Sequence, residues 1–255
     1  MEDDFLPRYA EELIEGEPRT PLDEPRERRP CIIEKVWDES DRYIGLRVNV
    51  DEDFQRAYQL PGQYVTLSPN EFEPRFLVIS NAPAVAKRSG WEFLVDRHTD
   101  LGRSIDPLQS GATLSISRPE GPGYPVDEVR NKHVVCFTTG SGIASIRPAI
   151  QFWAANPHLA PLGPTIYYGE SGPDDYAYVS EANDWGDQGV RLFYCDGSLD
   201  ESADGFRYVQ HAFEADNPDL EDAMVFISGA SVMKRTVISL LVKRGLSLDR
   251  IVTNV

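Results

Sequence analysis

Residues 133–153 read HVVCFTTGSGIASIRPAIQFW, and this stretch decides the fold of the second half of the chain. It begins with a continuous apolar run of the length of a buried strand, and residues 143–153 repeat apolar side chains with the spacing of a helix. Gly140 and Gly142 lie between the two segments. Glycine lets a backbone approach a ligand closely and a helix N-terminus attracts phosphate, so the stretch predicts a phosphate-binding turn. A tight turn that needs glycine only for its geometry is an equally good interpretation of these residues.

Further buried-type strands follow along the chain. They are TIYYG (165–169), VRLFYC (190–195), AMVFIS (223–228) and RIVTNV (250–255). Helical patterns separate most of them, most clearly SVMKRTVISLLVKRG (231–245), which a glycine at its end terminates. Strands that alternate with helices predict an α/β doubly wound domain, in which a parallel sheet carries helices on both faces.

The first half of the chain has a different rhythm of short, alternating apolar and polar segments. These are CIIEKVW (31–37), YIGLRVNV (43–50), QYVTLS (63–68), RFLVIS (75–80), WEFLVD (91–96) and ATLSIS (112–117), with one helical segment at 101–108. Such alternation is typical of half-buried antiparallel strands, and six of them predict a small closed barrel, an antiparallel six-stranded Greek-key β-barrel. We expect an acidic N-terminal tail at 1–29, the barrel at 30–129 and the α/β domain at 130–255.

The composition excludes several classes of protein. The 42 acidic residues against 25 basic ones give a net charge of −17, which disfavours binding to nucleic acid or anionic lipid. This surplus suits a salt-adapted, halophilic host, and an ordinary acidic bacterial protein is an equally good interpretation. The sequence contains no apolar run of membrane-spanning length and no signal peptide at its start, so we expect no membrane insertion and a cytoplasmic location.

The cysteines and histidines give no sign of a metal centre. Cys31, Cys136 and Cys195 are odd in number and far apart, so they predict neither a disulfide framework nor an iron–sulfur cluster, and they fit a reducing cytosol. The four histidines have no ligand spacing. We therefore expect no metal site.

Polar and glycine residues stand where the predicted parallel strands end. Thr139 and Ser141 flank the first glycine of the turn, and Glu170, Asp196 and Gly229 follow later strands. Ligands of open α/β sheets bind at the carboxyl ends of the strands, and carboxylates there suit a ribose hydroxyl and repel a 2′-phosphate. Solvated loop acids are the more common interpretation of such residues in a chain this acidic.

Taken in order, these residues resemble the ferredoxin–NADP reductase superfamily, most closely its stand-alone FAD/NAD(P)-binding oxidoreductases of plants and bacteria. The resemblance covers residues 30–255. The matching segments are PGQY (61–64), RFLV (75–78) at the place of an RxYS strand, GRS (102–104), TGSGI (139–143), YYG (167–169) and SGASVM (228–233).

The resemblance implies an FAD-binding barrel, an NAD(P)-binding α/β domain, and hydride transfer between NAD(P)H and the flavin. It assigns the FAD diphosphate to Arg75, Gly102, Arg103 and Ser104, and the lining of the isoalloxazine to backbone groups of Leu77, Val78 and Ile79. It assigns the nicotinamide nucleotide to Thr139, Gly140, Ser141 and Gly142, with Gly229 and Met233 nearby. Glu170 and Asp196, at the ends of successive strands, are the candidate partners of the ribose hydroxyls of this nucleotide.

The sequence departs from the family at the positions closest to the chemistry. Leu77 replaces a tyrosine that stacks on the flavin, Val78 replaces a serine near flavin N5, and Ser228 replaces a cysteine. Val78 and Ser228 are therefore the candidate catalytic positions. An arginine that often meets the 2′-phosphate aligns near Asp196, so NADH is favoured over NADPH.

Two main functions remain open from the sequence. The first is an FAD-dependent NAD(P)H oxidoreductase that passes electrons to an acceptor protein or a small acceptor. The second is an FAD/NAD-binding electron-transfer subunit with little intrinsic turnover. A nucleotide sensor that has lost the flavin is a third.

Overall fold

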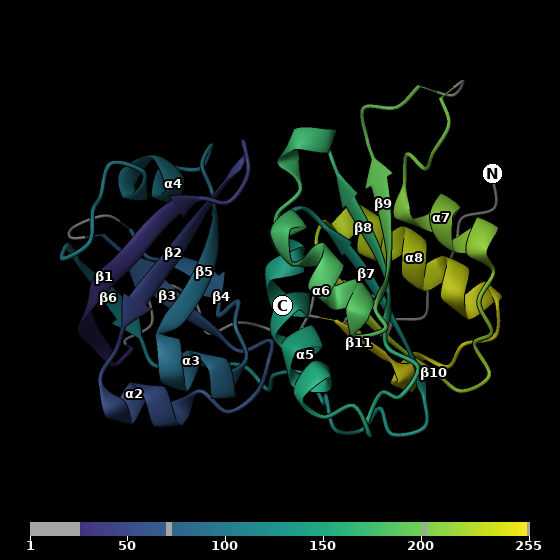
Figure 1. Cartoon of the computed structure of the whole chain (residues 1–255), viewed down its shortest axis with the longest axis horizontal. Coiled ribbons are helices and arrows are strands. Elements are labelled where there is room, and N and C mark those ends of the chain that lie inside the picture. Colours follow the sequence, from purple (N-terminus) through teal and green to yellow (C-terminus); the bar gives the residue numbers. More distant parts are fainter. Residues whose placement is uncertain (1–25, 70–72, 201–202, 254–255) are drawn as a thin grey trace.

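The computed structural model describes residues 26–69, 73–200 and 203–253, and it consists of two domains that lie side by side (Figure 1). Most of the tail expected at 1–29 lies outside the described residues. The first strand already begins at Arg28, so the last two residues of that segment belong to the barrel sheet.

The first domain is a six-stranded sheet in the order β4-β3-β6-β1-β2-β5, and every pair of neighbouring strands in it is antiparallel. Its strands are β1 (Arg28–Asp38), β2 (Tyr43–Asn49), β3 (Tyr64–Ser68), β4 (Arg75–Val78), β5 (Trp91–Asp96) and β6 (Thr113–Ser117). The helices α2 (Glu52–Ala57), α3 (Pro83–Ser89) and α4 (Asp100–Ile105) connect them. The edges of the sheet approach each other, since the Ser80 N–H just after β4 donates to the carbonyl of Glu92 in β5 at 2.8 Å. The sheet is thus a nearly closed barrel.

Alternating burial explains the barrel core. In β1, Cys31 and Ile33 are buried while Ile32 between them is half exposed. In β6, likewise, Leu114 and Ile116 are buried and Ser115 between them is only partly buried, whereas β3 is buried along its whole length. The core is built from side chains that include Leu46, Val65, Trp91, Phe93 and Ile116.

The second domain is a five-stranded parallel sheet in the order β11-β10-β7-β8-β9. Its strands are β7 (His133–Thr139), β8 (Thr165–Glu170), β9 (Arg191–Asp196), β10 (Ala223–Ser228) and β11 (Ile251–Thr253). Its α-helices are α5 (Ile143–Ala155), α6 (Ala182–Asp187), α7 (Val209–Asp216) and α8 (Ser231–Lys243), with short 3₁₀ turns at Gly140–Gly142, Pro173–Asp175, Val179–Glu181 and Leu248–Arg250. Helices α5 and α6 pack on one face of the sheet and α7 and α8 on the other. The fold class expected from the sequence is confirmed.

The order of strands in the second sheet reverses at β7. Strands β8 and β9 lie on one side of β7, and β10 and β11 lie on the other. In open α/β sheets such a reversal opens a crevice outside the carboxyl ends of the two diverging strands, here β7 and β10. The glycine turn predicted at 139–142 and the segment that begins at Ser228 are the two segments that leave these ends.

The two domains share one apolar cluster. Tyr43 and Leu94 of the barrel are buried in it together with Phe226 of β10. Tyr124, in the segment that links the two sheets, packs edge-on against Phe226 with ring centroids 5.3 Å apart, and the Trp153 indole N–H donates to the Val126 carbonyl at 2.9 Å. These buried contacts fix one domain against the other.

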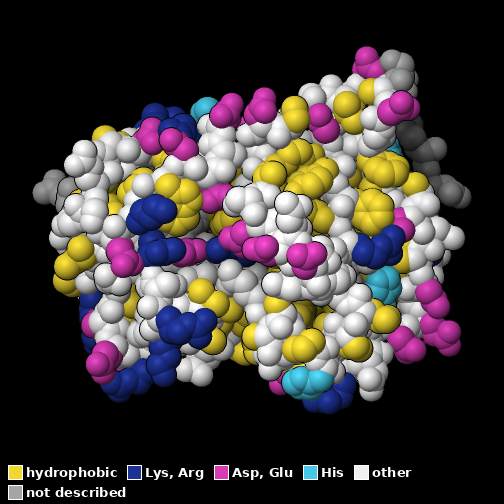
Figure 2. Space-filling model, in the orientation of Figure 1, with side chains coloured by type: hydrophobic (Ala, Val, Ile, Leu, Met, Phe, Trp, Pro, Cys, Tyr) yellow, Lys and Arg dark blue, Asp and Glu magenta, His cyan; other side chains and the backbone are white. Residues whose placement is uncertain are grey.

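On the face shown in Figure 2, Lys and Arg side chains lie mostly over the barrel domain and next to acidic side chains. Ion pairs account for several of them; Arg29, for example, pairs with Asp51 at 2.8 Å. None of the helices in the described part of the chain is long and apolar enough to cross a membrane.

Candidate active site

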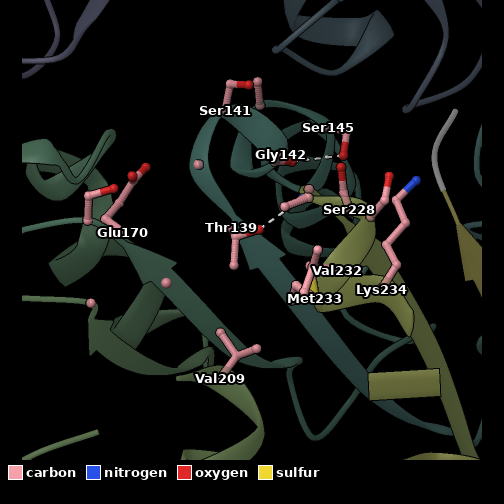
Figure 3. A pocket seen from close by; sticks show the side chains of 18 of the residues that line it. Thr139, Ser141, Gly142, Ser145, Glu170, Val209, Ser228, Val232, Met233 and Lys234 are labelled. Atoms are coloured by element: carbon pink, nitrogen blue, oxygen red, sulfur yellow. Dashed lines mark hydrogen bonds between the residues drawn. The ribbon is translucent and has the colours of Figure 1, made fainter. Parts of the chain in front are cut away.

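One cavity of about 1050 Å³ opens at the carboxyl ends of β7 and β10, and both domains line it. The barrel contributes Arg42, Phe76, Leu77, Val78 and Leu94. The α/β domain contributes the glycine turn, the first turn of α8 and, farther along, Gly197 with residues 207–210. Figure 3 shows Thr139 between Glu170 on one side and Ser228 and Met233 on the other.

The glycine turn rests directly on the segment after β10. A Cβ at Gly142 would lie 2.5 Å from the carbonyl oxygen of Ser228. A Cβ at Gly229, whose φ is +135°, would lie 2.3 Å from Thr139 Oγ1. That same Oγ1 accepts the Ala230 N–H at 3.1 Å. Glycine is therefore required at 142 and 229 by the contact between the two segments themselves.

Gly140 is a glycine for a different reason. Its φ is +60°, in the left-handed region, and a Cβ there would meet only the Tyr43 hydroxyl, at 3.5 Å. Beyond it Ser141 is exposed, and helix α5 begins with its N-terminus toward the cavity. The Ser145 hydroxyl donates to the Gly142 carbonyl at 2.9 Å and holds the turn on the helix (Figure 3).

The start of α8 brings buried side chains to the cavity. Ser228 and Met233 line it as expected from the resemblance. Lys234 also lines it and is only 6% exposed, and sequence reasoning did not single it out. A lysine on the first turn of a helix after a glycine-bearing strand end carries a cation into the cavity wall.

Glu170 is a buried acid at the boundary between the domains. Its side chain is 1% exposed, it accepts a hydrogen bond from the Tyr168 hydroxyl at 3.0 Å, and it lies 3.4 Å from the Arg42 guanidinium. Burial raises the pKa of Glu170 to about 7, against the opposing effects of Tyr168 and Arg42. The carboxyl lines the cavity, so it is not the solvated loop acid that composition favours.

Asp196 does not line this cavity, although Gly197 after it does. Its carboxylate accepts the N–H of Ser198 at 2.8 Å and the hydroxyl of Ser198 at 2.6 Å, and it is absent from the cavity lining. Arg207 and Tyr208 line that end instead, with the guanidinium 5.2 Å from the ring centroid. Sequence reasoning missed this pair, although a basic and an aromatic residue just before an apolar helical segment are a readable signal.

The barrel wall of the cavity is apolar. Leu77 lines the cavity and also packs on the barrel core. Phe76, which sequence reasoning passed over, lines the cavity beside it and packs edge-on against Tyr64 at 5.5 Å. Ile79 is fully buried in the barrel core, and its N–H donates to the Gln63 carbonyl at 3.1 Å. The strand thus offers Phe76, Leu77 and Val78 to a ligand, but not the side chain of Ile79.

A second cavity of about 430 Å³ adjoins the same strand. Its lining consists of Glu73, Arg75, Asp100, Leu101, Arg103 and Ser104. Arg75 pairs with Glu73 at 2.6 Å and Arg103 pairs with Asp100 at 2.5 Å. The structure therefore brings together three of the four residues assigned to the diphosphate.

Gly102, the fourth of these residues, serves the packing of α4. Its N–H donates to the Thr99 hydroxyl that caps the helix, at 3.0 Å. A Cβ at Gly102 would lie 2.1 Å from the carbonyl oxygen of Asp96, so the helix packs directly on the end of β5.

Comparison with known proteins gives the class of fold. No protein-family model matches the chain. Among solved structures, the cytochrome P450 reductase GcoB of Amycolatopsis has a TM-score of 0.75 at 19% identity, over 90% of this chain and 70% of that one. The ferredoxin-NADP+ reductase of Plasmodium falciparum has a TM-score of 0.73 at 16% identity, over 89% and 95% of the two chains. The chain therefore has the two-domain fold of the ferredoxin–NADP reductases, and the resemblance expected from the sequence is confirmed at this level.

Among curated proteins, the sulfhydrogenase 2 subunit gamma of Pyrococcus furiosus is 23% identical over 206 residues, which is 75% of this chain and 69% of that protein. The FAD/NAD-binding domain of the nitric oxide dioxygenase of Vibrio cholerae, a solved structure, aligns with a TM-score of 0.70 at 19% identity, over 88% and 97% of the two chains.

Proposed function

We propose that the protein is a flavin-dependent oxidoreductase that transfers hydride between NAD(P)H and bound FAD and passes the electrons to an acceptor. The observation that carries this proposal is a single cavity whose opposite walls come from the two domains, with Val78 on the barrel side and Ser228 on the other. Hydride transfer needs two rings held at roughly 3–3.5 Å, and a shared cavity between two nucleotide sites meets that need.

The residues present fit FAD on the barrel. Two guanidinium groups and the Ser104 hydroxyl of the second cavity suit a diphosphate. The apolar residues Phe76–Val78 follow Arg75 of that cavity along β4 and offer a partly buried apolar wall to a ring system. When bound, the flavin supplies the hydride acceptor. In the structure Glu73 and Asp100 pair with the two arginines. On binding a diphosphate, each arginine would exchange its carboxylate partner for phosphate oxygens.

The α/β domain fits the nicotinamide nucleotide. The turn Thr139–Gly142 at the start of α5 suits its diphosphate, because the N–H groups and the positive end of the helix dipole lie there. Gly229 and Met233 border the same space. At the far end, Tyr208 offers a half-exposed ring and Arg207 a cation. A preference for NADH stays a prediction. Arg207 favours the opposite preference, because its guanidinium could bind the additional phosphate of NADPH.

A subunit that binds the cofactors but turns over slowly is the second candidate. The relative from Pyrococcus furiosus is named as a subunit of a sulfhydrogenase, and Val78 gives the barrel wall no hydroxyl next to the reacting centre. In this reading electrons leave to a partner protein. The cytoplasm remains the expected location.

An absorption spectrum tests the proposal. The purified chain, reconstituted with FAD and freed of excess, is expected to be yellow and to bleach when NADH or NADPH is added without oxygen. Rapid reduction of ferricyanide in the presence of NAD(P)H distinguishes the oxidoreductase from the slow subunit. A chain that retains no FAD and shows no change of flavin absorbance overturns the proposal.

A further inference from the structure

Arg147 is a buried cation between the two domains. It lies on α5, and its side chain is 10% exposed. Within its own domain, its Nε and Nη2 groups donate to the Glu181 carboxylate at 2.6–3.0 Å, and its guanidinium stacks on the Tyr178 ring at 4.6 Å. Across the boundary, its Nη1 donates to the Glu92 carboxylate at 2.7 Å and to the Ser80 carbonyl at 2.9 Å.

The barrel partners of Arg147 lie in or just after strands that line the cavity. Ser80 follows two residues after Val78, and Glu92 precedes Leu94 by two residues in β5. On the other side, Arg147 is one turn of helix from Ile143, where α5 leaves the glycine turn. One guanidinium therefore joins the barrel wall of the cavity to the helix that carries its nucleotide wall.

Glu92 is held in its charged form for this contact. Burial raises the pKa of Glu92, but Arg147 and Arg47 together outweigh burial and lower it below its ordinary value. Arg47, from the neighbouring strand β2, donates to the other carboxylate oxygen at 2.6 Å. Both oxygens of Glu92 are thereby engaged with a cation.

Stability alone is a weak reason for such a network. The desolvation of buried charges offsets much of their attraction, and apolar replacements are often as stable. A fixed geometry is a better reason, because the planar guanidinium carries its N–H donors in a rigid fork, and its Nη1 group holds the Glu92 carboxylate and the Ser80 carbonyl at defined distances and angles. Other cross-boundary contacts, such as the Ala82 N–H to Gln151 at 2.8 Å and the indole bond of Trp153, keep the domains together without Arg147.

We propose that Arg147, through Glu92 and Ser80, is a positioning residue that sets the separation between the flavin wall and the nicotinamide wall of the cavity. This inference rests on the proposed function. A displacement of about 1 Å at a reacting centre can lower the rate about 100-fold, so the separation of the two walls has to be fixed.

Two matched variants test the proposal, because each removes one carboxylate from the same guanidinium. Glu92→Gln weakens the bond across the boundary, whereas Glu181→Gln weakens a bond within the α/β domain. With FAD bound, Glu92→Gln is expected to lower the rate of flavin bleaching at saturating NADH by at least tenfold and to weaken the nicotinamide–flavin charge-transfer absorbance. The Kd for NADH and the FAD content should stay within threefold. Glu181→Gln should stay within threefold in all four quantities.

A second readout needs no cofactor. The three native cysteines are buried, so spin labels attach to cysteines introduced at exposed Gln109 of the barrel and Leu162 of the α/β domain. Pulsed electron paramagnetic resonance should give a broader distribution of the distance between the two labels for Glu92→Gln than for Glu181→Gln or the parent. Equal widths and equal bleaching rates for the two variants would overturn the positioning role of Arg147. A broadened distribution for Glu92→Gln in a protein that never binds flavin would support that role and overturn the proposed function.

Discussion

Gly142 lies against the carbonyl oxygen of Ser228, so close that a Cβ at Gly142 would be 2.5 Å from that oxygen. The segments that leave β7 and β10 are thus in contact where the strand order reverses. The turn that we propose as the diphosphate site is supported by the neighbouring strand end. The same segment thus packs against the end of β10 and, in the proposed function, binds the ligand.

Gly142→Ala should therefore disturb binding through packing. We expect the Kd for NAD(P)H to rise at least tenfold and the free energy of unfolding to fall by about 1–3 kcal/mol, the usual cost of overpacking a rigid site. Titration calorimetry and urea unfolding measure the two quantities. Gly186→Ala is the control, because a Cβ there meets nothing within 4 Å and a helical alanine stabilises by about 0.5–1 kcal/mol. Unchanged affinity in Gly142→Ala would contradict the assignment of the turn.

Glu170 predicts a pH dependence of stability. Its pKa is raised from 4.5 to about 7, so between these values the folded state holds a proton that the unfolded state releases. Its contribution to stability is complete below about pH 4.5 and is lost as the pH rises through 7. A shift of this size corresponds to roughly 3 kcal/mol.

Glu170→Gln removes this dependence. Urea unfolding at pH 5 and pH 8 is expected to show a smaller loss of stability in the variant than in the parent, by an amount on the order of 3 kcal/mol. Glu52→Gln is the control, because Glu52 is exposed, and it should leave the pH dependence of stability unchanged. Glu39→Gln is unsuitable because Glu39 accepts a hydrogen bond across the domain boundary. Parallel pH profiles of Glu170→Gln and the parent would exclude a raised pKa.

The second cavity predicts which arginine retains the flavin. Arg75→Ala should lower the FAD content of the purified chain at least tenfold, because a hydrogen-bonded charge pair with phosphate is worth about 1.5–3 kcal/mol. Absorbance at the flavin band after gel filtration measures this content. Arg56→Ala is a matched loss of an exposed arginine, one that pairs with Glu52 on α2 away from both cavities, and this variant should retain the FAD. Equal FAD content in the two variants would count against the diphosphate site.

The fold was predictable because its strands carry strong local signals. Continuous apolar runs such as HVVCF and alternating runs such as WEFLVD match β7 and β5. The helical segment predicted at 101–108 matches α4, but the short helix α3 was missed, since it buries a single alanine and offers no periodicity. Helix α7 could have been predicted, because Val209, Ala212 and Phe213 are buried at helical spacing.

The site was predictable only where its residues lie at strand ends that the sequence itself marks. The glycine turn, Ser228 and Met233 stand at strand ends that the sequence marks, and they line the cavity. Arg147 and Glu92 are 55 residues apart, and Arg42 and Glu170 are 128 apart, so their contacts depend on the packing of the domains. The resemblance implies a phosphate-binding position near Asp196, yet a serine two residues further on donates to its carboxylate. Spacing along one strand does not show such a local hydrogen bond.

Arg207 predicts a test of coenzyme preference. If it meets the adenosine 2′-phosphate, Arg207→Ala should raise the Kd for NADPH by tenfold or more, since a charge-assisted bond is worth about 1.5–3 kcal/mol. The Kd for NADH should change less than threefold. Asp196→Asn is the companion variant, and it should leave the ratio of the two constants unchanged because Ser198 holds that carboxylate. A shift toward NADPH in Asp196→Asn would restore Asp196 as the determinant.

Val78 offers a gain-of-function test of the reacting centre. Val78→Thr keeps the shape of the side chain and adds a hydroxyl to the cavity wall where the resemblance implies a serine near flavin N5. A hydrogen bond made there is worth about 1 kcal/mol, so the anaerobic rate of flavin reduction by NADH is expected to rise about fivefold. Val78→Ala opens the same space without a hydroxyl and should not increase the rate. If Val78→Ala and Val78→Thr accelerate reduction equally, the change reflects access to the cavity and not the hydroxyl, and Val78 loses its place at the reacting atoms.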